Sequence, residues 1–417
     1  MFKDNVHQRI LDHLEDVRAW FWQRREGLAI PFYSSFDLRC SEFKIAVVDG
    51  NIYPAGFNNI CHVDKEHTVV LITDYLKKNY GSAQSKILLL TEEHTQNAYY
   101  WDNVYALQNL ISRAGAEVRV GMPRRIQEKT EFTSASGFKV VAEPVVFDSG
   151  RIHLSDYFPD LVISNNDFSY DYHAEWGEHL LTPMNPPREL GWYRRRKNVF
   201  FGAYNQLAAE FAQILGLDAW HFQVATENFS NFDLSDESRR RDLAVEVDAL
   251  LQRLHQDSLN HGDSRAPFIF VKNAAGTYGL GVTQVMGGQD ILNWTYKERK
   301  KMKAAKGGGG FSDVILQEGI ATHLTSEFET SEPVIYLIGC QLAGGFLRTH
   351  HDKGPTESLN SPGAVYKRLC VADLEIDITG NPLENVYGWV ARLGALAIGL
   401  EARTMGVNFQ GTCRTGN

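Results

Sequence analysis

Short apolar strands that alternate with an amphipathic helix constrain the fold more than any other feature of this sequence. Residues 86–90 and 117–120 have β-like composition, and the segment between them shows helical spacing until Gly115 ends it. A third apolar run follows at 161–163. Strands that alternate with helices usually pair in parallel, so we predict a parallel α/β unit over 73–185.

The sequence changes character on either side of this unit. Residues 1–72 combine an amphipathic helix, strand-like runs and a dense polar loop, whereas 186–417 open with a Pro-rich connector and a basic cluster. A chain of 417 residues is long enough for two or three cores. We therefore expect an α/β (α+β) protein with regions 1–72, 73–185 and 186–417.

Composition excludes several classes of protein. The net charge is −9, which disfavours non-specific nucleic-acid binding, and no run of about 18 apolar residues suggests a membrane span. The N-terminus lacks the apolar stretch of a signal peptide. None of the five cysteines forms a C-x-x-C pair. We expect a cytoplasmic protein with reduced thiols and without nucleic-acid or membrane partners, and the sequence allows a homodimer.

A lysine at the end of an apolar strand opens a glycine-rich loop in PFIFVKNAAGTYGLGV. Glycines let backbone N–H groups approach phosphate oxygens, and Lys272 can neutralise phosphate charge. The order of residues is not that of a P-loop. Alone, the pattern fits a glycine hairpin with a surface lysine equally well. The candidate phosphate-binding residues here are Lys272, Gly276, Gly279 and Gly281.

Further motifs follow in a fixed order along the chain. Lys197 precedes a helix, and an apolar strand leads into Gln317, Glu318, Gly319 and Ile320, whose backbone could read an adenine edge while Glu318 reaches a ribose hydroxyl. This order resembles the ATP-grasp superfamily, especially the peptide ligases of glutathione synthesis. The resemblance implies ATP as cofactor, Lys197 and Lys272 on its phosphates, and Lys272 and Arg348 as catalytic residues. The later residues that complete the order are Tyr336 beside the nucleotide, Arg348 beside the acyl phosphate, and Asn360.

The expected late magnesium ligands are missing from this order. Near the front, Asp49 and Asn51 stand two residues apart on an extended segment, so their side chains point the same way. Both are hard oxygen ligands suited to Mg²⁺. Eukaryotic glutathione synthetases carry such a pair early because they are circularly permuted, and this chain resembles them in that sense. The alternative is that both residues only cap a strand and shape a turn.

Polar groups that could bind substrate concentrate in DLRCSEFKIAVVDGNIYPAGFNNICH. Arg39 could clamp a carboxylate, and Asp37 could hold either that arginine or a substrate ammonium group. The alternative is a surface ion pair and a plain turn. Two further asparagines follow strands of the parallel unit, where ligands of such sheets bind. The predicted substrate residues are Asp37, Arg39, Asn58, Asn59, Asn97, Asn166 and Asn360.

The stretch as a whole resembles the bacterial glutamate–cysteine ligase family that is unrelated in sequence to the enterobacterial enzyme. PAGFNN is its most distinctive part, and TEEHTQNAYYWDN, SNND, PPRELGWYRRRK and QEGIATH fit as well. The resemblance implies ATP- and Mg²⁺-dependent joining of glutamate and cysteine through an acyl phosphate, the first step of glutathione synthesis. It also implies a permuted ATP-grasp segment in 1–72, an inserted substrate domain in 73–185 and a nucleotide-binding region in 186–417. Another carboxylate–amine ligase, or a non-catalytic nucleotide-binding protein, remains open.

Overall fold

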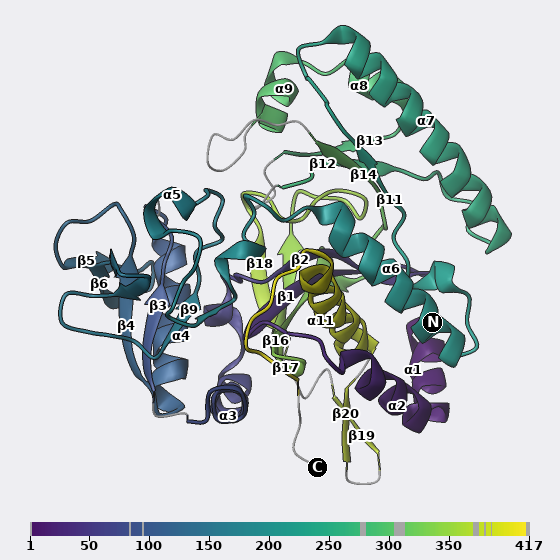
Figure 1. Cartoon of the computed structure of the whole chain (residues 1–417). Helices are drawn as coiled ribbons and strands as arrows, with labels where there is room; N and C mark the ends of the chain where they lie inside the picture. The colour runs from purple at the N-terminus through teal and green to yellow at the C-terminus, as the bar shows by residue number, and fades with distance from the viewer. Residues whose placement is uncertain are drawn as a thin grey trace.

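Both ends of the chain contribute strands to one antiparallel sheet (Figure 1). The computed structural model describes residues 2–82, 85–93, 96–275, 281–303, 313–369, 375–378, 381–384 and 386–413. The sheet joins strands from 1–72 to strands from the second half of 186–417, so its composition cuts across the predicted regions. Its order is β18 (Val365–Leu369), β17 (Gln341–His350), β16 (Glu329–Ile338), β1 (Tyr33–Cys40) and β2 (Ile45–Asn51), with β15 (Thr325–Ser326) paired to β16.

Alternate side chains of β16 face two different hydrophobic layers, as the period of two in a strand requires. Ile335 and Leu337 pack in the layer that contains α11 (Val386–Thr404) and α6 (Lys197–Ile214). Val334 and Tyr336 pack in the layer that contains α3 (His62–Tyr80) and α4 (Ala98–Arg113). The sheet is therefore covered on both faces, and polar residues in it must be satisfied by one another or by a ligand.

The predicted parallel strands form a second sheet beside the first (Figure 1). β3 pairs in parallel with both β4 and β9, and α4 makes the crossover from β3 to β4. This confirms the parallel arrangement predicted from the alternation of strands and helix. The sheet order is β10 (Met184–Asn185), β9 (Leu161–Ser164), β3 (Lys86–Leu90), β4 (Glu117–Met122), β6 (Lys139–Pro144) and an antiparallel edge strand β5 (Thr130–Thr133).

A third, antiparallel sheet carries the strand that ends in the predicted phosphate lysine. Its order is β11 (Thr226–Phe229), β14 (Val314–Glu318), β12 (Ile269–Asn273) and β13 (Val282–Val285). The helices α7 (Glu237–Asn260), α8 (Gly288–Leu292) and α9 (Tyr296–Lys303) belong to the same part of the chain, at the top of Figure 1. The Asp236 carboxylate accepts hydrogen bonds from the N–H groups of Ser238 and Arg239, which fixes the start of α7.

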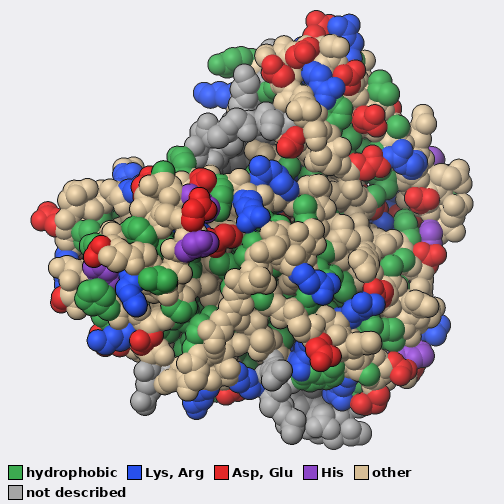
Figure 2. Space-filling model, viewed as in Figure 1, with side chains coloured by type: hydrophobic (Ala, Val, Ile, Leu, Met, Phe, Trp, Pro, Cys, Tyr) green, Lys and Arg blue, Asp and Glu red, His purple; other side chains and the backbone are tan. Residues whose placement is uncertain are grey.

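The remaining described elements lie around these three sheets. No described helix is both long and apolar enough to cross a membrane. Figure 2 shows acidic and basic side chains interspersed over the visible face. The elements are α1 (Phe2–Asp12), α2 (Leu14–Arg25), η1 (Phe57–Asn59), β7 (Val146–Asp148), β8 (Arg151–His153), α5 (His173–Trp176), η2 (Arg188–Leu190), η3 (Ala219–His221), β19 (Glu375–Ile378) and β20 (Asn381–Glu384).

The expectation that all thiols are reduced is wrong for one pair of cysteines. Cys340 and Cys413 form a disulfide across a sequence separation of 73 residues, with their Cα atoms 5.4 Å apart. Hydrogen bonds hold the C-terminal segment beside Cys340. The N–H and hydroxyl groups of Thr412 donate to Oδ1 of Asn79, and the N–H of Ile30 donates to the carbonyl of Gly411. Spacing along the chain could not reveal this proximity.

Candidate functional site

Two cavities border the antiparallel sheet that joins β1 and β2 to β15–β18, called the composite sheet below, and they meet at a common wall. The first cavity, of about 680 Å³, contains Lys197, Lys272 and Gln317, whereas the second, of about 1540 Å³, contains Asn58, Asn97 and several tyrosines. They are not separate sites, because the same side chains border both. The shared residues are Asp37, Asp49 and Asn360.

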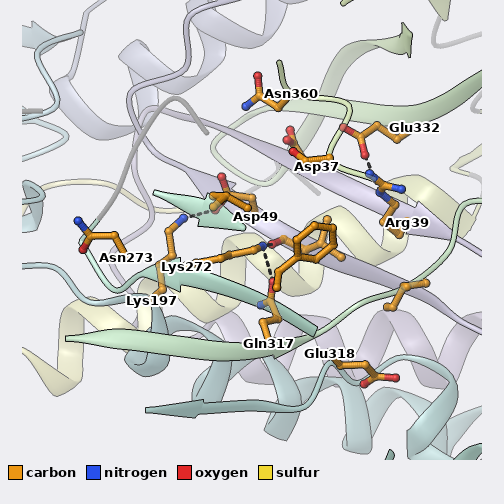
Figure 3. Close-up of a pocket in the computed structure, with 15 residues that line it drawn as sticks. Asp37, Arg39, Asp49, Lys197, Lys272, Asn273, Gln317, Glu318, Glu332 and Asn360 are labelled. Atoms are coloured by element: carbon orange, nitrogen blue, oxygen red, sulfur yellow. Dashed lines mark hydrogen bonds and ion pairs between the residues drawn. The ribbon is translucent and has the colours of Figure 1, made fainter. Parts of the chain in front are cut away.

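Lys197 and Asp49 form an ion pair at the edge of the first cavity, although 148 positions separate them in the chain (Figure 3). Nζ of Lys197 lies 2.5 Å from Oδ1 of Asp49. Burial, the largest influence, favours a higher pKa for Asp49, but Lys197, Lys272 and Arg195 together outweigh it and lower that pKa. Asp49 is therefore an anion held against two cations.

Lys272 reaches the same place from β12. Its Nζ donates to the carbonyl of Val48 at 3.1 Å and to Oε1 of Gln317 at 2.5 Å (Figure 3). Burial lowers the pKa of Lys272 to about 8, against the opposing influence of Asp49. The hydrogen-bond acceptors that the described residues offer to this ammonium group are neutral carbonyl-type oxygens, and an anion would be a stronger partner.

A β-bulge makes the carbonyl of Val48 available to this lysine. The register between β1 and β2 passes from Leu38–Val47 to Asp37–Asp49, so Val48 is the extra residue and has no counterpart on β1. Bulges re-aim side chains and carbonyls at the edge of a site. Here the bulge also places Asp37 and Asp49 opposite each other across two strands.

Alternating charges run along the wall behind the shared residues. Nη1 of Arg348 lies 2.6 Å from Asp37 and 2.6 Å from Glu332, and Nε of Arg39 lies 2.6 Å from Glu332. Burial raises the pKa of Asp37, and the nearby carboxylates of Glu332 and Asp49 raise that pKa further. The charge of Arg348 acts in the opposite direction and lowers it. The alternative of a surface ion pair between Asp37 and Arg39 is wrong, because Arg39 is buried, Asp37 is half-buried, and each takes its partner from β16 or β17.

Arg39 braces a loop rather than presenting a free guanidinium group. Besides Glu332, it donates to the carbonyls of Pro355 at 3.1 Å and Glu357 at 2.8 Å. That loop carries Asn360 to the common wall of the cavities. The geometry therefore does not support the prediction that Arg39 clamps a substrate carboxylate.

Strand β14, which ends at Glu318, contributes Gln317 and Glu318 to the lining of the first cavity, but Glu318 is paired with a protein lysine. The carboxylate of Glu318 lies 2.5 Å from Nζ of Lys44 and accepts from the N–H of Ala225 at 3.0 Å, and Figure 3 shows it directed away from Lys197 and Lys272. Ile320 lines the cavity. Gly319 is required for space, since an added Cβ would lie 2.1 Å from the ring of Phe268.

The glycine loop after Lys272 is described only at its ends. Gly281 begins the return with φ of +64°, a left-handed conformation that favours glycine, and its carbonyl accepts from the N–H of Asn273 at 3.1 Å. Gly276 and Gly279, both predicted to contact phosphate, lie outside the described residues.

The second cavity gathers most of the predicted substrate residues. Asn58, Asn59, Asn97 and Asn51 line it together with Arg348. The amide of Asn58 donates to that of Asn59 at 2.9 Å, and the amide of Asn97 caps α4 by accepting from the N–H of Tyr99.

Two predicted residues lie elsewhere than expected. Tyr336, predicted beside the nucleotide, lines the second cavity, where its hydroxyl leaves no room for a Cβ at Gly56 of the PAGFNN loop. Asn166 lines neither cavity: its amide donates to the carbonyl of Thr91 and to Tyr172, and accepts from the N–H of Phe168. Because these bonds occupy its side chain, the geometry does not support a substrate role for Asn166.

The structure adds acidic residues that the sequence did not single out. Glu332 lies within a strand and gave no motif-level signal. Glu92 follows β3 within TEEHTQN, at the strand end where ligands of parallel sheets bind. Its position in the sequence could therefore have indicated that it lines a ligand cavity. Both are buried, and each lines one cavity.

The oxygen donors at the common wall fit a magnesium ion. Asp37 and Asp49 are cross-strand neighbours, so two carboxylates lie close enough to act on one ion, although Arg348 and Lys197 now offset their mutual repulsion. Asn51 and Asn360 add amide oxygens. The described residues contain no cluster of three or more His, Cys, Asp or Glu side chains for a metal. Two carboxylates suit Mg²⁺, which keeps waters and takes its other ligands from phosphates.

Comparisons with known proteins show the family to which this chain is related. The family described as GshA, glutamate-cysteine ligase, matches residues 7–402. A crystal structure from Methylobacillus flagellatus KT, bearing the provisional name gamma-glutamylcysteine synthetase, is similar with 31% identity, 95% coverage of each chain and a TM-score of 0.81. A D-alanyl-alanine synthetase A of Vibrio cholerae O1 biovar eltor str. N16961 shares 12% identity over 78% of this chain and 81% of its own, and its TM-score of 0.30 is too low to indicate a common fold. Among curated protein sequences none matches this chain.

Proposed function

We propose, because this chain belongs to the glutamate–cysteine ligase family, that its first cavity binds ATP and its second cavity binds the amino acids that are joined. The family activity forms gamma-glutamylcysteine and is the first step of glutathione synthesis.

The observation that carries the proposal is the common wall. A reaction that moves phosphate from ATP onto a carboxylate requires the two ligands to touch, and enzymes achieve this mainly by positioning and charge neutralisation. Asp37, Asp49 and Asn360 border both cavities, and the two lysines converge beside them. A nucleotide in one cavity and an amino acid in the other would meet there.

The first cavity has the composition that a nucleotide needs. Lys197 and Lys272 now contact protein oxygens, which phosphate oxygens would replace as stronger partners. Phe270, Val282 and Ile320 supply an apolar wall for an adenine ring. The lining of this cavity thus offers charged groups for a triphosphate and apolar groups for an adenine.

Magnesium would be held by Asp37 and Asp49 with help from Asn51 or Asn360. The ion supplies neutralisation of phosphate charge when it is bound. Asp49 is suited to such a ligand, since the influence of the lysines already keeps its pKa low and its carboxylate ionised.

The reaction follows from these positions. An oxygen of the glutamate γ-carboxylate attacks the γ-phosphorus, the bond from that phosphorus to ADP breaks, and an acyl phosphate forms. The nitrogen of cysteine then attacks the acyl carbon, inorganic phosphate leaves, and the nitrogen loses a proton as the amide forms. Lys272 and Lys197 hold the transferred group, and Arg348, held by Asp37 and Glu332, adds fixed positive charge beside it.

The proposal includes a circularly permuted ATP-grasp architecture. Its support is the composite sheet, in which β1 and β2 from the start of the chain complete strands β16 to β18 from near its end. The metal residues thus precede the phosphate lysines in sequence while lying beside them in space.

An isotope experiment tests the acyl phosphate directly. Glutamate labelled with ¹⁸O in its γ-carboxylate is incubated with ATP, Mg²⁺, cysteine and the enzyme, and released phosphate is analysed by mass spectrometry. We expect one labelled oxygen in each phosphate released. Unlabelled phosphate together with product formation would rule out the acyl phosphate.

A further inference from the structure

An ion pair between Arg195 and Glu401 is buried close to the first cavity. Arg195 stands two residues before Lys197, where α6 begins, and Glu401 lies on α11. Nε of Arg195 lies 2.9 Å from both carboxylate oxygens of Glu401, and Nη2 lies 2.8 Å from Oε2. The two residues are 1% and 0% exposed, and neither lines either cavity. The pair can therefore act on a ligand only through other residues.

Stability alone does not account for this pair. Taking two charges out of water costs free energy that their attraction often fails to recover, and apolar residues of similar volume commonly serve the fold as well. α6 and α11 already pack through apolar side chains such as Phe201 and Leu393, which belong to the same hydrophobic layer. The two helices thus have an apolar contact that does not involve Arg195 or Glu401.

The pair is joined to the site through the segment that begins α6. The guanidinium carbon of Arg195 lies 4.8 Å, and Nζ of Lys197 lies 5.0 Å, from the centroid of the same Trp192 ring. Along the backbone, the N–H of Lys197 donates to the carbonyl of Ala274 at 2.9 Å, where the chain leaves β12. Because Glu401 holds Arg195 in a two-pronged contact, it also restricts the direction in which Lys197 extends.

The charges of the pair also act on the common wall. Burial, the largest influence, favours a higher pKa for Asp49, but Arg195 joins the two lysines of the first cavity in lowering it overall. Burial raises the pKa of Glu401, whereas the charges of Arg195 and Lys197 act to lower it. Without Arg195, the carboxylate of Glu401 would therefore attract Lys197 away from a phosphate.

From these contacts we propose that Arg195 and Glu401 are positioning residues, which hold Lys197 in the direction of the nucleotide phosphates. The proposal rests on the proposed function, because it takes the first cavity as the ATP site. It gives α11 a part in nucleotide binding, although none of the described residues of that helix lines either cavity.

A double substitution separates positioning from stability. Arg195→Met/Glu401→Leu removes both charges and keeps most of the apolar volume, so the melting temperature should stay within about 4 °C of the wild type. We expect the KM for ATP to rise roughly tenfold or more, because Lys197 loses its fixed direction. The KM for glutamate at saturating ATP should change less than about twofold. Assays of ADP release and differential scanning calorimetry measure these quantities.

A second ion pair provides the matched control. Arg119 and Glu143 form two hydrogen bonds between the paired strands β4 and β6, and neither residue lines either cavity. Arg119→Met/Glu143→Leu removes the same two charges from a different sheet, and it should leave the KM for ATP within about twofold of the wild type.

A conservative variant tests the geometry of the contact. Arg195→Lys keeps a positive charge for Glu401 but lacks the two-pronged contact, so the KM for ATP should rise about threefold to fivefold, less than in the double variant. This variant retains the buried charge pair, and it therefore also serves as the test if Arg195→Met/Glu401→Leu fails to fold.

Several results would overturn the positioning role. A folded double variant with a wild-type KM for ATP would do so, as would equal rises in the KM values for ATP and glutamate. A wild-type KM for ATP in Arg195→Lys would exclude the role even if the double variant does not fold. Absence of glutamate- and cysteine-dependent ADP release in the wild type would instead overturn the proposed function, and this inference with it.

Discussion

The first and second cavities share a wall but are assembled in different ways. The first is dominated by two buried lysines that come from strand ends and helix starts with recognisable local sequence. The second combines amides, tyrosines and one arginine from segments that only the fold brings together. Phosphate is recognised mainly by concentrated charge, which a short motif can encode, whereas an amino acid is recognised by a shaped set of polar groups.

The largest expected effect comes from removing charge from the first cavity. Lys272→Met should lower kcat/KM for ATP by at least about 100-fold, because the phosphate loses a positioned cation. The free energy of unfolding should change by less than about 2 kcal/mol, since losing the bonds to Val48 and Gln317 is offset by no longer burying a charge. Steady-state kinetics and urea denaturation measure the two quantities.

Lys78→Met is the control for this substitution, because Lys78 is exposed on α3 and lines neither cavity. It should be silent in both measurements. Near wild-type activity in Lys272→Met would remove Lys272 from the nucleotide site.

A smaller, pH-dependent effect should separate the cavities. With a pKa of about 8, Lys272 loses its charge as pH rises through that value in the ligand-free enzyme. The KM for ATP should then rise above pH 8, approaching tenfold per pH unit, while the KM for glutamate at saturating ATP should not follow it. Lys272→Arg, which stays charged, should flatten the profile. An ATP KM that is constant to pH 9.5 in the wild type would contradict this.

The same lysine affects stability with a definite sign. Its folded-state pKa of about 8 lies below the ordinary value of 10.5, so between these pH values the unfolded chain binds more protons. Stability from this group alone therefore rises with pH across that window, by roughly 3 kcal/mol in total, and its burial is most costly below pH 8.

The smallest expected effect on activity distinguishes a structural asparagine from a ligand-facing one. Asn166→Ala should lower the free energy of unfolding by roughly 1–3 kcal/mol, because it leaves buried partners of its amide unsatisfied, and should change the KM for glutamate less than about twofold. Asn58→Ala, in the second cavity, should raise that KM several-fold with little change in stability. The reverse pattern would return Asn166 to the site.

Local sequence was sufficient for several parts of the fold and site. The alternation of apolar runs predicted the parallel strands β3, β4 and β9, because periodicity is fixed by which faces of an element are buried. The spacing of Asp49 and Asn51 correctly placed both on one face of a strand, where they line the same cavity. The motif order that resembles ATP-grasp enzymes grouped Lys272 with Gln317, and their side chains form a hydrogen bond.

Other parts depended on partners from distant segments. Arg39 was predicted to clamp a substrate, but residues 355–357 and Glu332 use its guanidinium group. Tyr336 has the alternation of a core strand, and only the sheet order decides that its face borders the second cavity. The disulfide of Cys340 required knowing the return of the C-terminal segment.

By itself, the sequence determined the parallel unit, the family resemblance and the kinds of residue that bind phosphate, because these depend on local periodicity and on chemistry carried by single side chains. Only the tertiary structure decided which charges pair, which asparagines face a cavity and which residues border both cavities. The physical reason is that a buried polar group takes its partner from whatever segment packs against it. Such a segment can be distant in sequence, since 311 residues separate Asp37 from its partner Arg348.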